Sequence, residues 1–172
     1  MARPRLSAPT IGVHSSFLEA VEEYRAEGGY PDFEDLEIHE PAAFAAYVAA
    51  LRRDHDLWPS SVTPDLLLIF WWIDGPEYLG RLSVRPIPTP ELAEYGHIGY
   101  DIKPSARRCG HGTAMLRAAL PIVNRLGVDP ALLTSRTRNI ASRRMIEANG
   151  GRFIHQRGDR LYFHLPTHAG SR

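Results

Sequence analysis

Cysteine is nearly absent from this 172-residue sequence, since Cys109 is the only one. A single cysteine excludes an intrachain disulfide and a cysteine-based metal site, and it is typical of a protein from a reducing compartment. Lysine is equally rare: Lys103 stands alone, and all other basic residues are arginines. We therefore predict a cytoplasmic protein without a bound metal.

Long apolar runs and an excess of charge are also missing. The longest apolar run covers residues 66–73, whereas a membrane-spanning helix needs about 20 residues. Residues 1–5 contain no apolar core of the kind found in signal peptides. The formal net charge is +0, which argues against nucleic acid or an anionic membrane as the main partner. The length fits one domain over residues 1–172.

The spacing of apolar residues predicts an α+β domain with a mixed sheet. The predicted helices lie between Phe17 and Gly28, between Pro41 and Leu51, between Gly112 and Gly127, and from Asn139 to Asn149. The predicted strands are residues 66–73, 79–84, 95–102, 131–135, 152–155 and 161–165. Residues 30–35 and 57–64 read as loops, and Asp74-Gly75 is a hairpin signal.

The segment from Ile102 to Thr113 carries the clearest chemical signal. A strand ends there, a short basic loop follows, and Gly110 and Gly112 open a helix. The first amides of a helix are unpaired and carry partial positive charge, and glycine lets a phosphate approach them closely. We therefore predict a pyrophosphate site, although a Gly-x-Gly sequence can also be a simple tight turn.

Two common nucleotide-binding motifs do not fit this segment. A P-loop requires Lys followed by Ser or Thr after its second glycine, but Thr113 follows directly here. A dinucleotide-binding fingerprint requires a third glycine where Met115 stands, and an acidic residue about 20 positions later. The sequence meets neither requirement.

The stretch from Arg107 to Gly112 matches the pattern Arg/Gln-x-x-Gly-x-Gly/Ala and resembles the signature of the GNAT superfamily of N-acetyltransferases. Residues 139–151 resemble the second acetyl-CoA motif of the same family. The resemblance covers residues 66–165. It implies a central, mixed, mostly antiparallel twisted sheet flanked by about four helices. The sheet would be splayed between its fourth and fifth strands, with acetyl-CoA in the gap.

The resemblance also implies residue roles. Backbone groups of residues 100–102 would pair with the pantetheine arm, and the amides of residues 108–113 would hold the pyrophosphate. Arg107 and Arg108 would add charge, Asn139 would bind the pantetheine arm, and Arg143 the adenosine phosphates. The implied cofactor-binding residues are Tyr100, Asp101, Ile102, Arg107, Arg108, Cys109, Gly110, His111, Gly112, Thr113, Asn139 and Arg143. Asn139 is equally suited to cap a helix, and we interpret Cys109 as a packing residue.

Direct acetyl transfer to an amine needs a base for the amine proton and an acid for the departing thiolate. Glu94 and His97 are the candidate bases, on or just before the third predicted strand. The family often has a tyrosine acid in its last helix, where this sequence has Ile146. Tyr100 or solvent would take over that role.

We therefore expect an acetyl-CoA-dependent N-acetyltransferase acting on an amine of a small molecule or peptide. A non-catalytic acyl-CoA-binding or sensing module is the alternative, and a plain interaction domain is a third. The acceptor would lie against the N-terminal helices, where Asp32, Glu34 and Asp35 either attract a cationic amine or keep a loop solvated. The family would also allow a homodimer through the last strands.

Overall fold

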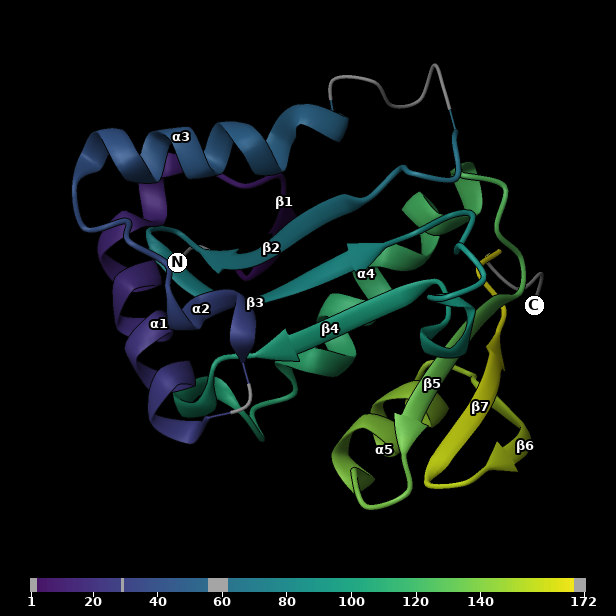
Figure 1. The fold of residues 1–172 in the computed structure, drawn as a ribbon. Helices are drawn as coiled ribbons and strands as arrows, with labels where there is room; N and C mark the ends of the chain where they lie inside the picture. Colours follow the sequence, from purple (N-terminus) through teal and green to yellow (C-terminus); the bar gives the residue numbers. More distant parts are fainter. Residues whose placement is uncertain (1–2, 29, 56–61, 169–172) are drawn as a thin grey trace.

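The computed structural model describes residues 3–28, 30–55 and 62–168, so part of the predicted loop 57–64 lies outside the described residues. Figure 1 shows an open, twisted sheet with helices on both faces. The helices are α1 (His14–Glu27), α2 (Pro31–Glu34), α3 (Pro41–Arg52), α4 (His111–Arg125) and α5 (Ile140–Ala148). The strands are β1 (Arg5–Ser7), β2 (Leu68–Asp74), β3 (Glu77–Val84), β4 (Ile98–Ile102), β5 (Ala131–Arg136), β6 (Arg152–Arg157) and β7 (Arg160–Leu165).

The strands form two hydrogen-bonded sheets, β1-β2-β3-β4 and β5-β7-β6, and all pairs within them are antiparallel. Among the described residues the sheets are joined by one isolated bridge, between Gly96 and Leu133. The amide of His97 also donates to the carbonyl of Leu132 at 2.8 Å. From this junction β4 and β5 run in roughly the same direction and move apart (Figure 1). The splay predicted between the fourth and fifth strands is confirmed.

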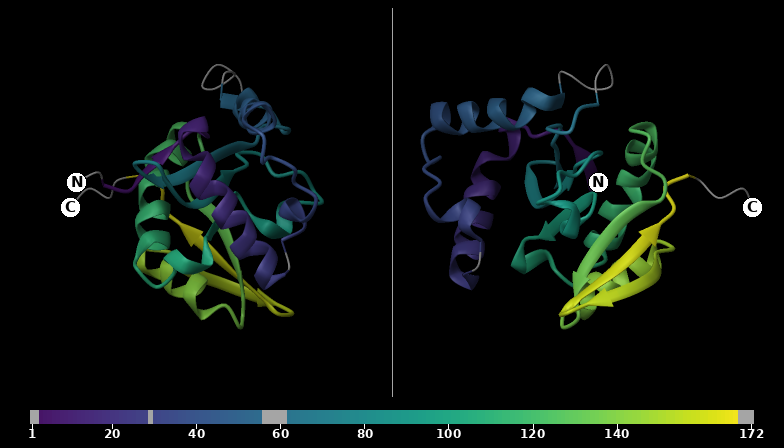
Figure 2. Two further views of the ribbon diagram at one scale, coloured as in Figure 1. Left: turned by 90° about the vertical axis from the view of Figure 1, so that its left-hand side faces the viewer. Right: turned by 45° about the vertical axis from the view of Figure 1, so that its right-hand side comes forward.

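Each face of the first sheet is covered by its own apolar core. Trp71 and Trp72 are neighbours on β2 and therefore point to opposite faces. Trp71 packs with residues of α1 and α3, and Trp72 with residues of α4 and α5. The run 66–73 is apolar at every position because β2 is buried on both sides. Figure 2 shows α1 and α3 on the side away from the β5-β7-β6 sheet.

Three local predictions were wrong. The loop predicted over residues 30–35 contains the short helix α2, because Phe33 is fully buried and stacks on Tyr24 with ring centroids 4.9 Å apart. The third predicted strand begins at Ile98 rather than at residue 95, since Gly96 adopts φ 77 and interrupts the extended chain. The strand β1 was missed because three residues are too few to show a periodic pattern.

The second of these corrections changes the geometry expected for the candidate bases. Glu94 lies in a 3-10 turn, Ala93–Tyr95, and not on a strand. Glu94 therefore precedes β4, with the turn and Gly96 between it and the first strand residue, Ile98. In the part of the chain that the structure describes, no helix is long and apolar enough to cross a membrane.

Candidate functional site

The loop between β4 and α4 has an unusual backbone. Arg108 has φ 61 and is the one residue other than glycine with a positive φ in the described ranges. Gly110 follows with φ 81 and ψ 0, in the left-handed region. Left-handed residues in a turn favour concave arrangements of amides that bind anions.

The amides of this loop are free of internal partners. The six consecutive amide nitrogens of residues 108–113 donate no hydrogen bond within the described part of the chain, and the first helical bond runs from Ala114 N to Gly110 O at 3.1 Å. The preceding amides are used, since Ala106 and Arg107 donate to Lys103 and Pro104. The chain thus presents a continuous run of donors at the N-terminus of a long helix, which suits a phosphate group.

The two glycines of the signature serve different purposes. A Cβ atom on Gly112 would lie 2.6 Å from the Sδ atom of Met145, so this glycine lets α4 pack closely on α5. A Cβ atom on Gly110 would meet nothing within 4 Å, and there the left-handed φ explains the glycine. Open space beside Gly110 is compatible with a ligand that approaches the loop.

The side chains around the loop differ in availability. Arg108 and Cys109 are exposed, and the Cys109 thiol makes one weak contact with the carbonyl of Arg107 at 3.4 Å. The interpretation of Cys109 as a packing residue was therefore wrong. His111 accepts a hydrogen bond on Nδ1 from the indole N–H of Trp72 at 3.2 Å. This bond leaves the proton of a neutral His111 ring on Nε2. The guanidinium of Arg107, predicted to add charge to the pyrophosphate site, is instead bonded to Glu27 of α1.

Asn139 caps α5, across the gap from β4. Its side-chain oxygen accepts from the amide of Ser142 at 3.0 Å, which is the capping role considered for it. Arg143 is exposed and forms an ion pair with Glu147, with Nε and Oε1 2.9 Å apart. Capping leaves the amide group of Asn139 at the start of α5, where the predicted pantetheine contact would also lie.

Tyr100 joins β4 to α5. Its hydroxyl lies 2.7 Å from Oγ of Ser142, and Ser142 precedes Ile146 by one helical turn. Burial raises the pKa of Tyr100 to about 12, although the hydrogen bond with Ser142 opposes the shift. Tyr100 therefore keeps its proton at neutral pH. The sequence reasoning missed Ser142 because its partner is 42 residues away.

The two candidate bases lie near the closed end of the gap. His97 accepts on Nδ1 from the amide of Leu132 at 2.8 Å, so the neutral ring carries its proton on Nε2. Burial lowers the pKa of His97, and the nearby His164 lowers it further. Glu94 is exposed and has no hydrogen bond or ion pair to any other described residue. Of the two candidate bases, Glu94 alone has a lone pair that is free to accept a proton in this conformation.

The family of the chain follows from a comparison with known families. Residues 20–152 match the model of the acetyltransferase (GNAT) domain, and this span contains the free amides, Asn139 and Tyr100. The chain belongs to the GNAT acetyltransferase family. No curated protein sequence is similar enough to count as a match.

Solved GNAT structures share the fold at low identity. RimJ of Mycobacterium smegmatis, solved with a CoA disulfide, has a TM-score of 0.65 and 16% identity, over 95% of this chain and 85% of that one. The putative acetyltransferase YncA of Salmonella typhimurium, solved with acetyl-CoA, has a TM-score of 0.63 and 10% identity, over 98% and 96%. RimL, a ribosomal L7/L12 alpha-N-protein acetyltransferase, has a TM-score of 0.58 and 15% identity, over 96% and 95%.

The opposite side of β4 in this GNAT domain is occupied by a charged cluster under α1. Asp101 accepts from the hydroxyl of Tyr24 and from Nε of Arg81, the latter at 3.1 Å. Arg81 also pairs with Asp32 at 3.1 Å. Each carboxylate oxygen of Asp101 thus accepts a hydrogen bond on this side of β4, so its side chain is held away from a ligand in the gap. Asp35 is exposed.

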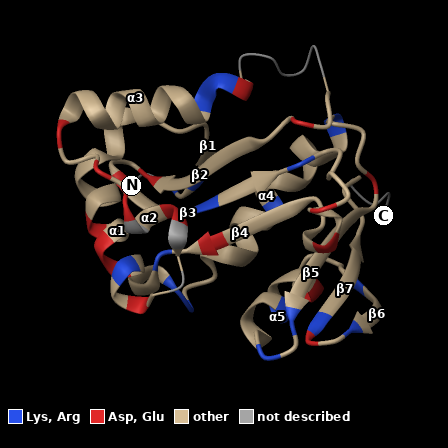
Figure 3. Cartoon of the chain, in the orientation of Figure 1, with Lys and Arg blue, Asp and Glu red and all other residues tan. Residues whose placement is uncertain are grey.

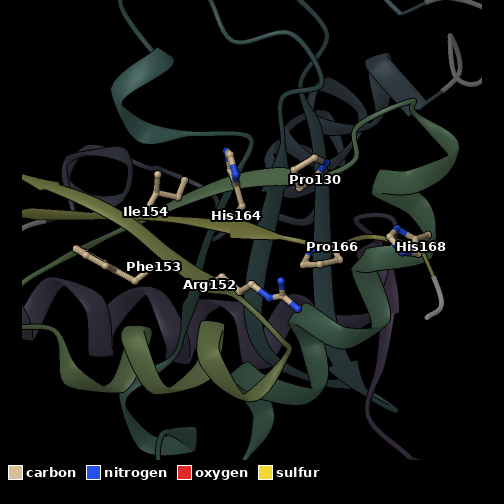
Figure 4. A pocket seen from close by; sticks show the side chains of 7 residues that line it. All are labelled: Pro130, Arg152, Phe153, Ile154, His164, Pro166 and His168. Carbon is tan, nitrogen blue, oxygen red and sulfur yellow. The ribbon is translucent and has the colours of Figure 1, made fainter. Parts of the chain in front are cut away.

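Two surface grooves lie apart from the GNAT signature. Figure 4 shows the first, which lies against the β5-β7-β6 sheet and is lined by Pro130, Arg152, Phe153, Ile154, His164, Pro166 and His168. The second is lined by Arg25, Asp35, Leu36, Glu37, His39, Glu40 and Ala43. Neither contains a residue of the free-amide loop. Among the described residues, no group of His, Cys, Asp and Glu is arranged to hold a metal ion.

Proposed function

We propose that this GNAT domain transfers an acetyl group from acetyl-CoA directly to an amine of a small molecule or peptide. The observation that carries the proposal is the run of six free amides, residues 108–113, at the end of β4 and the start of α4. They lie beside a gap whose two strands have backbone pairing only around Gly96 and His97 among the described residues. Structural neighbours were solved with acetyl-CoA or CoA, which supports the cosubstrate.

The binding role of each element follows from its free groups. The amides of residues 108–113 would hold the pyrophosphate, and Arg143 would face the adenosine phosphates. β4 pairs with β3 along one edge, from Gly80↔Ile102 to Val84↔Ile98. Its other edge faces the gap, so backbone groups of residues 100–102 would pair with the pantetheine amides as an added strand would. Asn139 would bind the pantetheine arm from the start of α5.

The reaction replaces the carbon–sulfur bond of the thioester by a carbon–nitrogen bond, and it requires one proton transfer from the amine and one to the thiolate. The amine nitrogen forms a bond to the thioester carbonyl carbon, and the carbon–sulfur bond then breaks. Glu94 would accept the amine proton; His97 could do so only after giving up its bond from Leu132. Tyr100 would donate a proton to the leaving thiolate, since its hydroxyl is protonated at neutral pH. Backbone amides at the end of β4 would polarise the carbonyl.

A non-catalytic acyl-CoA-binding or sensing module is the second candidate. Two observations favour it: Ile146 occupies the position of the family's tyrosine acid, and Nδ1 of His97 is already bonded. Both candidates require CoA binding, and only the first requires turnover. We propose a cytoplasmic location for either, with β6 at the edge of its sheet as the contact in a homodimer.

The acceptor is proposed only as an amine. RimL is named for acting on a ribosomal protein N-terminus, and the acetyltransferase MccE was solved with acetyl-CoA and AMP. The structural match covers 91% of the MccE chain, at 11% identity and a TM-score of 0.65. Relatives with such different partners support a range of small-molecule and peptide amines for this chain.

The test is thiol release from acetyl-CoA with a panel of polyamines, amino sugars and N-terminal peptides. We expect turnover with wild type that falls about 100-fold in Tyr100→Phe, as is typical when a general acid is lost, with acetyl-CoA binding retained. Tyr95→Phe is the matched control, because Tyr95 is exposed and its hydroxyl has no hydrogen bond to another described residue. Binding without turnover on any amine would favour the sensing module, and absence of binding by folded protein would contradict both candidates.

A further inference from the structure

Two carboxylates on α1 reach the loop that precedes α4. Glu23 accepts from the amide and the hydroxyl of Ser105, both at 2.7 Å. Glu27, one helical turn later, accepts from both terminal nitrogens of Arg107 at 2.6 and 3.0 Å. Figure 3 shows acidic segments along α1 with basic segments beside its C-terminal end. These contacts connect residues about 80 positions apart in the sequence.

Arg107 is the first residue of the GNAT signature, yet its side chain serves the protein's own framework. Besides Glu27, it donates to the carbonyl of Ile102 at 2.9 Å and to the hydroxyl of Tyr30 at 2.9 Å. Four hydrogen bonds thus occupy a group that has five N–H donors. The guanidinium ties the end of β4 to α1, and its charge is balanced by Glu27.

The next residue shows why such an anchor is needed. Arg108 adopts φ 61, which is unfavourable for a residue with a Cβ atom and persists only where the surroundings impose it. Ser105 and Arg107, both held by α1, lie just before it. Among the described residues, the bonds to Glu23 and Glu27 are the only side-chain hydrogen bonds that connect Ser105 and Arg107 to α1.

We propose that Glu23 and Glu27 are positioning residues that hold the loop of residues 105–110 in the conformation that exposes the six free amides. The N-terminal helix α1 would therefore set the affinity for acyl-CoA without touching it. This inference rests on the proposed function, because it assumes that the free amides bind the pyrophosphate.

A purely electrostatic role and a positioning role of these carboxylates predict opposite changes in CoA affinity when a carboxylate is removed. Removing a carboxylate near an anion site should strengthen CoA binding slightly if the charge acts only through space. If the carboxylate positions the loop, its removal lowers the population of the binding conformation and weakens binding by the same factor. The direction of the change thus separates the two effects.

The experiment measures CoA binding by calorimetry for wild type, Glu27→Gln and Glu19→Gln. Glu19 is the matched control: it is an exposed carboxylate on α1 with no hydrogen bond or ion pair to another described residue. We expect Glu27→Gln to weaken binding about tenfold, the difference between a charged and a neutral hydrogen bond. Glu19→Gln should leave binding unchanged or slightly tighter.

A second ligand distinguishes positioning from general damage. Acetyl-pantetheine lacks the pyrophosphate, so its affinity, followed by NMR titration, should be the same in wild type and Glu27→Gln. Arg107→Gln should resemble Glu27→Gln, and the double variant should be no weaker than either. If Glu27→Gln does not fold, Glu23→Gln provides the same test from the other contact.

The results separate this inference from the proposed function. Equal or tighter CoA binding by folded Glu27→Gln would overturn the positioning role while leaving the pyrophosphate site intact. An equal loss of CoA and acetyl-pantetheine would overturn it as well. Failure of wild type to bind CoA would instead contradict the proposed function.

Discussion

Gly96 lies at the closed end of the gap between β4 and β5, and Gly96→Ala tests whether this junction holds the splayed sheet together. An added Cβ would lie 2.3 Å from the carbonyl oxygen of Leu132, a backbone atom that cannot rotate away. The residue also has φ 77, which disfavours any side chain. The substitution therefore has to move β5 away from the start of β4.

The expected cost follows from the contacts that this movement would break. The left-handed conformation costs about 1–2 kcal/mol for alanine. The two hydrogen bonds between His97 and Leu132, both 2.8 Å long, contribute about 1 kcal/mol each. The sum is about 3–4 kcal/mol, which lowers the melting temperature of a domain of this size by roughly 10 °C.

Thermal and urea unfolding of Gly96→Ala would measure this cost against a matched control. Gly158→Ala shares the positive φ, 58, but its Cβ would meet nothing within 4 Å. We expect Gly158→Ala to lose only the free energy of unfolding that corresponds to the left-handed conformation of alanine, about 1–2 kcal/mol. If Gly96→Ala lost no more than Gly158→Ala, the junction would not hold the two sheets together and the reasoning would be refuted.

Two further predictions concern His97 and Asn139. Burial lowers the pKa of folded His97, so the unfolded chain binds the proton more readily, and stability should fall as the pH drops below about 6.5, through the folded pKa. In urea titrations at several pH values, His97→Gln should lose less stability than wild type over this range. The same pH dependence of stability in both proteins would contradict the role given to His97. Asn139→Ala should destabilise the protein by about 1 kcal/mol through loss of the cap. Asn139→Asp should recover that stability, and calorimetry then shows whether acetyl-CoA also needs the side-chain amide; equal stability of all three proteins would contradict the capping role.

Sequence reasoning worked where the signal is local. The free amides at the start of α4 follow from two glycines and a helix start in one segment, and their binding of a pyrophosphate stays a prediction. The helices α1, α3, α4 and α5 could be predicted because each has a continuous apolar face and a recognisable start or end. β2 could be predicted because burial on both faces makes it apolar throughout.

The parts that could not be predicted depend on distant partners. Glu23 and Glu27 look like ordinary surface carboxylates on α1 until the loop 80 residues later is placed beside them. Ser142 looks like a first-turn helix residue until Tyr100 reaches it. The sequence makes His97 a candidate base, yet its Nδ1 accepts from a backbone amide on β5. Such contacts arise from the topology of the sheet, which apolar spacing does not encode.

The central claim is that the free amides of the loop before α4 bind the pyrophosphate of acetyl-CoA. Cys109 lies among them, is exposed and packs against little else, so Cys109→Asp adds a negative charge there without disturbing the core. Cys109→Asn has the same shape without the charge. By calorimetry, we predict micromolar acetyl-CoA binding by wild type and Cys109→Asn, and loss of binding by Cys109→Asp at an unchanged or higher melting temperature. Equal binding by all three proteins would contradict the claim.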